Sequence, residues 1–329
     1  MRARWLLPLL AACAAPDPAH TPAPLIVARE APAPRAADDA PPPPQAASAP
    51  SAAPAPPSIQ EVAARTAREL ERAGLSRPSA RRPGDGALAR ELHPGFHATG
   101  ARGPDDPAVE SSRQFVTRVL DALFHERFGR APEPPVLLVL LRDAGSYERF
   151  CREAWSAACI SPYGFYVPTE RRLVVNLGPG IGTLSHELVH PIVEADFPGA
   201  PTWLNEGIAS LFEAPVLARP GEIHGATNWR TPTLKAALAT PGGRAAVSLR
   251  ALFELDDAGF RADGAEQRNY AAARTLCQWL DSRGQLFPFS RAYRDGFATD
   301  PRGERAFARV TGTTLEEANP AWLRWAARL

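Results

Sequence analysis

The chain has 329 residues, and its 37 Lys and Arg residues nearly balance its 36 Asp and Glu residues, which leaves a formal net charge of +1. This balance argues against nucleic acid as a partner, because a nucleic-acid-binding domain usually carries a clear excess of basic residues.

The N-terminus has the pattern of a targeting segment. Arg2 and Arg4 precede a short apolar run, Trp5–Ala12, that cannot span a bilayer as a helix. We therefore expect residues 1–12 to be a signal peptide.

The apolar run ends in Leu-Ala-Ala-Cys at residues 10–13, which resembles the bacterial lipobox. The resemblance implies that Cys13 is lipidated and anchors the protein to a membrane. Ala14, rather than Asp, follows the cysteine, and this resembles an outer-membrane address. An ordinary signal peptide that happens to contain a cysteine is the alternative.

Residues 13–57 are rich in Pro and Ala and cannot build a hydrophobic core. Such a segment forms an extended, semi-stiff spacer of about 3.1 Å per residue. We therefore expect an exported protein that is tethered in the cell envelope. The folded part is expected to comprise an N-terminal helix and loop, 58–107, and a larger domain, 108–329.

The first half of the folded part shows alternating helix and strand patterns. Ser58 to Leu75 predicts an amphipathic helix with Ser58 as its cap, and residues 76–107 predict a loop. A second helix is expected over Val109 to Phe128. The six apolar residues Val136 to Leu141 predict a buried central strand, and Ser146 to Trp155 predicts a short helix.

The second half is mainly helical. Tyr163–Val167 and Arg171–Leu177 predict a hairpin, and a helix is expected to begin near Thr183. Further helices are predicted over Thr202–Glu213 and Gln267–Ser282. Because strands are few among many helices, the pattern favours an α+β fold over a doubly wound sheet.

Three cysteines remain if Cys13 is lipidated, and an exported domain meets oxidising conditions. Cys151 and Cys159 are the near pair, whereas Cys277 lies in an apolar helical pattern and is expected to be buried. An unbroken helix would place the near pair about 12 Å apart, beyond disulfide reach. A Cys151–Cys159 bond therefore requires the helix to end near Trp155.

The strongest chemical signal is His186-Glu187-Leu-Val-His190. Positions four apart share one face of a helix, so both imidazoles can bind one Zn²⁺. Glu187 lies beside that face and can accept a proton from the metal's water without being a ligand. His93 and His97 are also four apart, but Pro-Gly between them argues against a helix and against metal binding.

A catalytic zinc site needs a third protein ligand. The helix expected over Thr202–Glu213 offers Glu206, sixteen residues after His190. Glu206 lies on the face opposite the apolar stripe of that helix, together with Ser210 and Glu213. We predict one zinc ion per chain, bound by His186, His190 and Glu206, and no organic cofactor.

These segments resemble the gluzincin metallopeptidases, especially the small peptidase-MA-like domains. The resemblance rests on the His-Glu-x-x-His motif and on Trp203-Leu-Asn205-Glu206-Gly207, which is also similar to aminopeptidase-N-type enzymes. It implies a zincin core, in which an edge strand holds extended substrate beside the active-site helix. Arg171–Leu177 fits that edge strand.

Two features depart from the family. Aminopeptidase-N relatives carry a Gly-Ala-Met-Glu-Asn motif, but Met1 is the only methionine here, which favours an endopeptidase or a specialised envelope peptidase. Pro191 directly follows His190, and we expect it to kink the helix or to end it early.

The proposed hydrolysis also needs a donor for the oxyanion besides the metal. Only Tyr270, Tyr293 and His224 follow Glu206 as candidates. Tyr270 opens a helix that resembles the one beginning with the transition-state tyrosine of aminopeptidase-N-type enzymes, and it is assigned that role. The alternative is that Tyr270 anchors its helix to the core.

The favoured function is therefore a zinc-dependent peptidase of the cell envelope, acting on peptide or protein substrates. Two alternatives stay open. The protein could be a tethered, non-catalytic binding or scaffolding module that contains zinc, or a zinc hydrolase of non-peptide amide bonds. The intact Glu187 argues against the first, because a structural site has no use for an acid beside its metal.

Overall fold

The computed structural model describes residues 56–76 and 88–329. The signal peptide, Cys13 and nearly all of the tether that the sequence predicts lie outside the described residues. Residues 57–329 form one compact unit, so the helix at 59–72 and the segment up to residue 107 belong to the same body as the rest of the fold.

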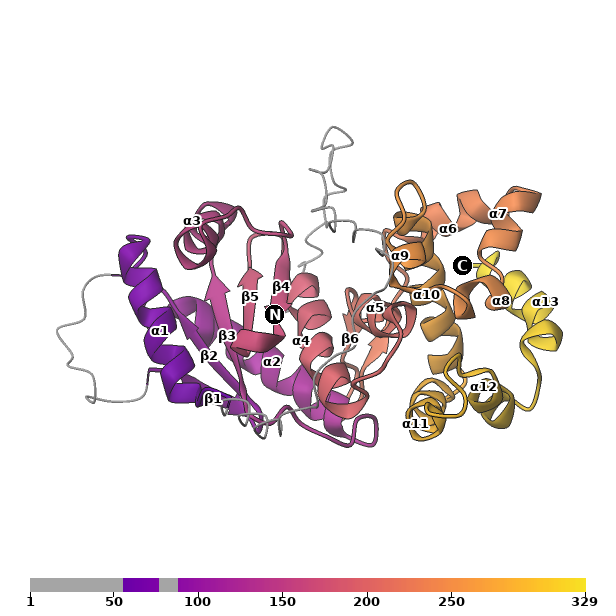
Figure 1. The fold of residues 1–329 in the computed structure, drawn as a ribbon, viewed down its shortest axis with the longest axis horizontal. Helices are drawn as coiled ribbons and strands as arrows, with labels where there is room; N and C mark the ends of the chain where they lie inside the picture. The colour runs from indigo at the N-terminus through magenta and orange to yellow at the C-terminus, as the bar shows by residue number, and fades with distance from the viewer. Residues whose placement is uncertain (1–55, 77–87) are drawn as a thin grey trace, which may run out of the picture. The chain divides into compact units, whose positions relative to one another are not determined.

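A five-stranded mixed sheet lies in the N-terminal half of this unit, in the order β1-β2-β3-β5-β4 (Figure 1). Strands β2, β3 and β5 are parallel to one another, whereas β1 and β4 pair antiparallel at the two edges. The strands are β1 (Arg90–His93), β2 (Phe96–Gly100), β3 (Val136–Leu141), β4 (Gly164–Val167) and β5 (Arg172–Asn176).

Helices cover both faces of this sheet, which explains why all six residues of β3 are buried. One face carries α1 (Ile59–Arg72) and α3 (Ala144–Trp155), whose apolar residues pack on Leu137 and Val139. The other face carries α2 (Pro107–Phe124) and α4 (Ile181–Asp196), which pack on Leu138. The mixed architecture confirms the predicted α+β class.

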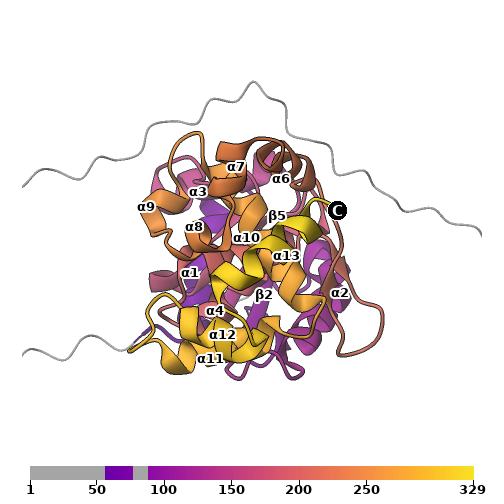
Figure 2. The same ribbon diagram turned by 90° about the vertical axis from the view of Figure 1, so that its right-hand side faces the viewer.

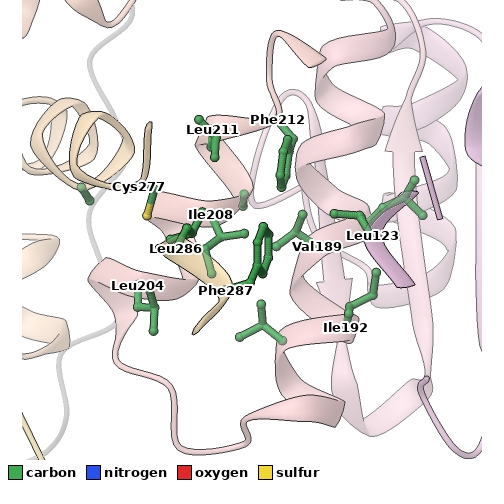
Figure 3. Close-up of a cluster of buried hydrophobic side chains, with 14 of the residues drawn as sticks. Leu123, Val189, Ile192, Leu204, Ile208, Leu211, Phe212, Cys277, Leu286 and Phe287 are labelled. Carbon is green, nitrogen blue, oxygen red and sulfur yellow. The ribbon is translucent and has the colours of Figure 1, made fainter. Parts of the chain in front are cut away.

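Helix α5 (Thr202–Leu211) connects the sheet to the C-terminal helices, since it packs against both α4 and α10 (Glu266–Asp281) (Figure 1). Its close approach to α10 depends on Gly207, where a Cβ would lie 2.8 Å from the Cys277 sulfur and 3.0 Å from the Ala273 carbonyl oxygen. Figure 3 shows apolar side chains of α4 and α5 meeting Phe287 and Cys277 in one core. This packing fixes α4 and α5 relative to each other.

The remaining elements complete a mainly helical C-terminal half, in which α11 and α12 lie side by side (Figure 2). They are β6 (Pro215–Val216), β7 (His224–Gly225), α6 (Thr231–Leu238), α7 (Pro241–Ala246), α8 (Leu249–Phe253), α9 (Asp257–Phe260), α11 (Leu286–Gly296), α12 (Glu304–Thr311) and α13 (Leu315–Ala326). In the sheet, the 3₁₀ turn η1 (Pro168–Glu170) joins β4 to β5. Within the described part of the chain, no helix is both long and apolar enough to cross a membrane.

Several local predictions match the structure. Ser58 caps α1 through a capping box with Glu61. Helix α3 ends at Trp155, and Cys151 and Cys159 form a disulfide with their Cα atoms 5.4 Å apart. Cys277 is a buried free thiol.

The prediction of a loop over residues 76–107 was wrong for its second half. Residues 90–100 form β1 and β2, and Pro94-Gly95 makes the tight turn between them. His93 and His97 therefore lie on two paired strands, not in a loop. The sequence does not reveal these strands because they are short and because β2, with which β1 pairs, joins the sheet through β3, far along the chain.

Two further predictions need correction. The strand at the edge next to α4 is β4, whereas β5, which the sequence assigned to that edge, lies inside between β3 and β4. Helix α4 also does not end early at Pro191, but continues to Asp196. Pro191, Ile192 and Val193 are all buried, so core packing sustains the helix across the missing amide hydrogen bond.

Candidate metal centre

Helix α4 places two histidines on one face. It begins after Gly180, whose φ of 115° suits glycine and redirects the chain from β5 into the helix. His186 and His190 are one turn apart, and their ring centroids lie 5.0 Å from each other. Both rings are partly buried and face α5.

Glu206 of α5 completes a three-residue cluster. Its Oε2 lies 3.6 Å from His186 Nε2 and 4.0 Å from His190 Nε2, and one ligand atom from each residue lies within 4.8 Å of the others. The structure thus brings together the three residues that the sequence singled out. These residues could hold a metal ion.

The donor atoms fit such an ion. Glu206 is 8% exposed, and its Oε2 is buried without a hydrogen-bond partner. A buried carboxylate oxygen without a donor is costly. A cation bound between Oε2 and the two imidazole Nε2 atoms removes that cost, and imidazole with carboxylate is a common donor set for divalent metals.

The opposite nitrogens of both rings face oxygen atoms. His190 Nδ1 lies 2.9 Å from Asn205 Oδ1, and His186 Nδ1 lies 3.3 Å from Glu213 Oε1. An oxygen beside Nδ1 favours the proton on that nitrogen and leaves Nε2 free as a metal ligand. Asn205 therefore orients His190 through a hydrogen bond, whereas His186 Nδ1 has only the longer contact with Glu213 and no hydrogen bond.

Glu213 is itself held firmly. Arg230 donates to both of its oxygens, with Nη2 2.7 Å from Oε1 and Nε 3.0 Å from Oε2, and the Asn228 amide donates to Oε2 at 2.7 Å. Burial raises the pKa of Glu213, but His186 and Arg230 outweigh it and lower the pKa to about 2. Burial likewise lowers the pKa of His186, whereas Glu206 and Glu213 raise it to about 10. Because a metal ligand must be the neutral imidazole, a metal ion would have to displace the proton from Nε2 when it binds.

No sequence motif assigned Glu213, Asn228 or Arg230 a role in the site. A signal existed for Glu213 alone, since it follows Glu206 by seven residues, or about two helical turns, and so shares its face. Asn228 and Arg230 come from the loop after β7, where no periodicity shows their direction. Only the tertiary fold brings them to Glu213.

Glu187 lies beside the cluster without belonging to it. The side chain is buried, and its Oε2 is 4.0 Å from His190 Nε2. Burial raises its pKa, and the two histidines partly oppose that shift. Gly164 of β4 makes room for it, because a Cβ there would lie 2.9 Å from Glu187 Cγ.

Two more residues border Glu206. Arg261, at the end of α9, donates from Nη2 to Glu206 Oε1 at 3.2 Å, so the two oxygens of this carboxylate have different surroundings. Tyr270 is partly buried at the start of α10. Burial and then the nearby Glu206 carboxylate raise the pKa of its hydroxyl, which keeps it protonated at neutral pH.

The other two candidates for an oxyanion donor lie elsewhere. The Tyr293 hydroxyl donates to the Pro301 carbonyl at 2.7 Å, within the packing of α11. His224 Nδ1 lies 2.9 Å from Asp281 Oδ2. Tyr270 is therefore the one of the three whose pKa is raised by burial and by the Glu206 carboxylate.

Comparison with known proteins gives one family match. The model of a family described as a protein of unknown function (DUF1570) matches residues 180–295. The matched segment spans α4 to α11 and contains every residue of the candidate centre named above. No curated protein and no solved structure matches the chain.

Proposed function

We propose that the protein is a zinc-dependent peptidase that hydrolyses peptide bonds. The observation that carries this proposal is the buried carboxylate of Glu187 beside a cluster of two histidines and one glutamate. Three protein ligands with a neighbouring free carboxylate are typical of catalytic zinc sites, whereas structural sites close with a fourth ligand. Two imidazoles and one carboxylate are a known ligand set of catalytic zinc, and the neighbouring Glu187 carboxylate, which can accept a proton from metal-bound water, is what favours zinc here.

His186, His190 and Glu206 would hold the metal, which supplies Lewis acidity when bound: it lowers the pKa of water and polarises a carbonyl group. Glu187 accepts a proton at its carboxylate from the attacking water and later delivers it to the leaving amine. Burial suits it to both tasks, because a raised pKa brings a carboxylate closer to the operating pH of a proton shuttle.

Tyr270 is the proposed donor to the oxyanion that forms when water adds to the carbonyl. Its hydroxyl stays protonated beside Glu206 and can donate a hydrogen bond. Its ring is fixed between the Arg230 guanidinium, 4.6 Å from the ring centroid, and the Phe260 ring, at 5.0 Å. A donor held in place before reaction needs no reorganisation in the transition state.

The sheet edge favours a peptide over other amides. Strand β4 lies at the edge, and the Asn176 amide donates to the Tyr163 carbonyl at 2.8 Å. By the alternation of an antiparallel ladder, the backbone groups of Gly164 and Tyr166 then point away from β5. An extended peptide can pair with them as an added strand, directly beside Glu187.

The protein is also proposed to act in the cell envelope, anchored through Cys13. The Cys151–Cys159 disulfide supports an oxidising compartment, since such bonds are rare in reducing ones. Mass spectrometry of the mature N-terminus tests the anchor, and an unmodified Cys13 would contradict it.

Incubation of the full-length protein with a peptide library from a denatured proteome tests the activity. Sequencing of the products is expected to show cleavage that a chelator abolishes and added zinc restores. Absence of any chelator-sensitive cleavage in zinc-loaded protein would favour the non-catalytic alternative. Release of ammonia or amine from non-peptide amides alone would favour the other hydrolase.

A further inference from the structure

Trp229 is exposed beside the candidate centre. Within the described residues, four large hydrophobic side chains are exposed: Ile160, Tyr163, Val216 and Trp229. Trp229 is 43% exposed and lies in the loop between β7 and α6. Tryptophan is usually well buried or placed at binding surfaces, so an exposed one beside a reactive cluster invites a functional explanation.

The indole is held in position by a cation. The Arg230 guanidinium carbon lies 4.1 Å from the Trp229 ring centroid and 4.6 Å from the Tyr270 ring centroid, so it is stacked between the two rings. The same guanidinium binds both oxygens of Glu213, whose Oε1 lies 3.3 Å from His186. The exposed ring is therefore connected to His186 through two residues, Arg230 and Glu213.

Both neighbours of Trp229 are tied to the same carboxylate. The Asn228 side chain donates to Glu213 and accepts the Arg230 amide at 3.0 Å. The segment 228–230 of this loop therefore has little freedom to fold the indole into the core. This rigidity matters because a side chain fixed before binding loses little entropy when a ligand packs on it.

We propose that Trp229 is a specificity-determining residue, on which an apolar and preferably aromatic side chain of the substrate packs next to the cleaved bond. This inference rests on the proposed peptidase function. The Arg230 guanidinium is already paired with Glu213, so the surface around Trp229 offers the substrate an aromatic ring and not an unpaired cation. Aromatic side chains stack on such a ring, whereas a small or acidic side chain gains little from it.

The test uses quenched peptides in which the residue on each side of the central bond is Phe, Ala or Asp in turn. Of the two peptides with Phe beside the central bond, the one that wild-type protein cleaves faster is expected to have a kcat/KM about tenfold above that of the peptide with Ala at the same position. Trp229→Ala should remove this preference and leave the Ala peptide within about twofold, and Trp229→Phe should restore most of it. Val216→Ala, at an equally exposed apolar position, is the matched control and should keep the preference.

A merely structural Trp229 gives a different pattern. Its loss would lower zinc content and slow all peptides alike, because Arg230 and Glu213 would lose their support. Binding of the Phe and Ala peptides to Glu187→Gln protein, with and without Trp229→Ala, measures selectivity without turnover. Cleavage or binding with an unchanged Phe-to-Ala ratio in Trp229→Ala overturns the inference, whereas a wild-type protein that neither cleaves nor binds any peptide overturns the proposed function itself.

Discussion

Two buried ionic clusters lie on opposite faces of the central sheet, and they are built differently. On the face of α1 and α3, Arg172 is 1% exposed, and its guanidinium pairs with Glu69 and Glu170. The rings of Trp155 and Phe150 lie 4.8 and 5.7 Å from it. A permanent cation sits at the centre of this cluster, with carboxylates and rings around it.

On the face of α4, the arrangement is reversed. Arg230 binds both oxygens of Glu213 and Arg261 binds Oε1 of Glu206, while Glu206 Oε2 faces two imidazole nitrogens. The first cluster is electrostatically complete through its own side chains, as a structural element requires. The second places acceptor atoms at its centre, as a metal-binding element requires. The comparison separates a charge cluster that stabilises the fold from one suited to chemistry.

The largest effect should come from removing a ligand. His186→Ala takes away one of three donors, and zinc affinity should fall on the order of 10³-fold or more, since each ligand supplies several kcal/mol of binding. Zinc measured after dialysis should drop from about one per chain to near zero. His224→Ala, which removes a histidine outside the centre, should keep full occupancy.

Removing the central cation of the other cluster should damage stability instead. Arg172→Met leaves Glu69 buried without its partner, at a cost of about 3–5 kcal/mol in the free energy of unfolding. Arg65→Met, which breaks a partly exposed ion pair to Glu170, should cost less than about 1 kcal/mol. Chemical denaturation of both variants decides this, and equal stabilities would contradict the assignment of Arg172 as a structural centre.

Removing the Tyr270 hydroxyl should affect turnover more than binding. As a transition-state donor it should contribute roughly 10²–10³ in kcat, so Tyr270→Phe should slow turnover by that factor with little change in zinc content or thermal midpoint. If Tyr270 only anchors α10, kcat should stay nearly normal. Tyr293→Phe, which loses the hydrogen bond to Pro301, is the control and should lower stability without slowing turnover.

The smallest of these effects is expected at Glu213. Glu213→Gln keeps the size of the side chain but weakens its contacts with His186 and Arg230, so zinc affinity should fall about 10–100-fold. Competition with a zinc chelator of known affinity measures this loss. An affinity equal to that of the wild type would show that Glu213 does not orient His186.

The helices and the candidate metal ligands could be predicted because their signals are local. Ser58 with Glu61 marks the start of α1, and the four-residue spacing of His186 and His190 is a property of one helix. Glu206 could be added because it follows on the next helix. These inferences needed no knowledge of how distant segments pack.

The missed features all depend on packing between distant segments. Strands β1 and β2 are short, and β2 pairs with β3, some 40 residues away, so their pattern alone looks like a loop. The position of β4 at the edge is a property of sheet order, which periodicity does not encode. The hydrogen bonds from Arg230 to Glu213 join the loop before α6 to the turn that follows α5. Helix α4 passes through Pro191 because its neighbours in the core outweigh one lost hydrogen bond.

The most direct test of the central claim compares zinc content and peptide hydrolysis in wild-type and Glu187→Gln protein. The substitution preserves shape and leaves the three ligands in place, but it removes the proton acceptor beside them. We predict about one zinc per chain in both proteins, with hydrolysis reduced on the order of 10²–10⁴-fold in the variant. Zinc-dependent hydrolysis at the wild-type rate in Glu187→Gln would contradict the account.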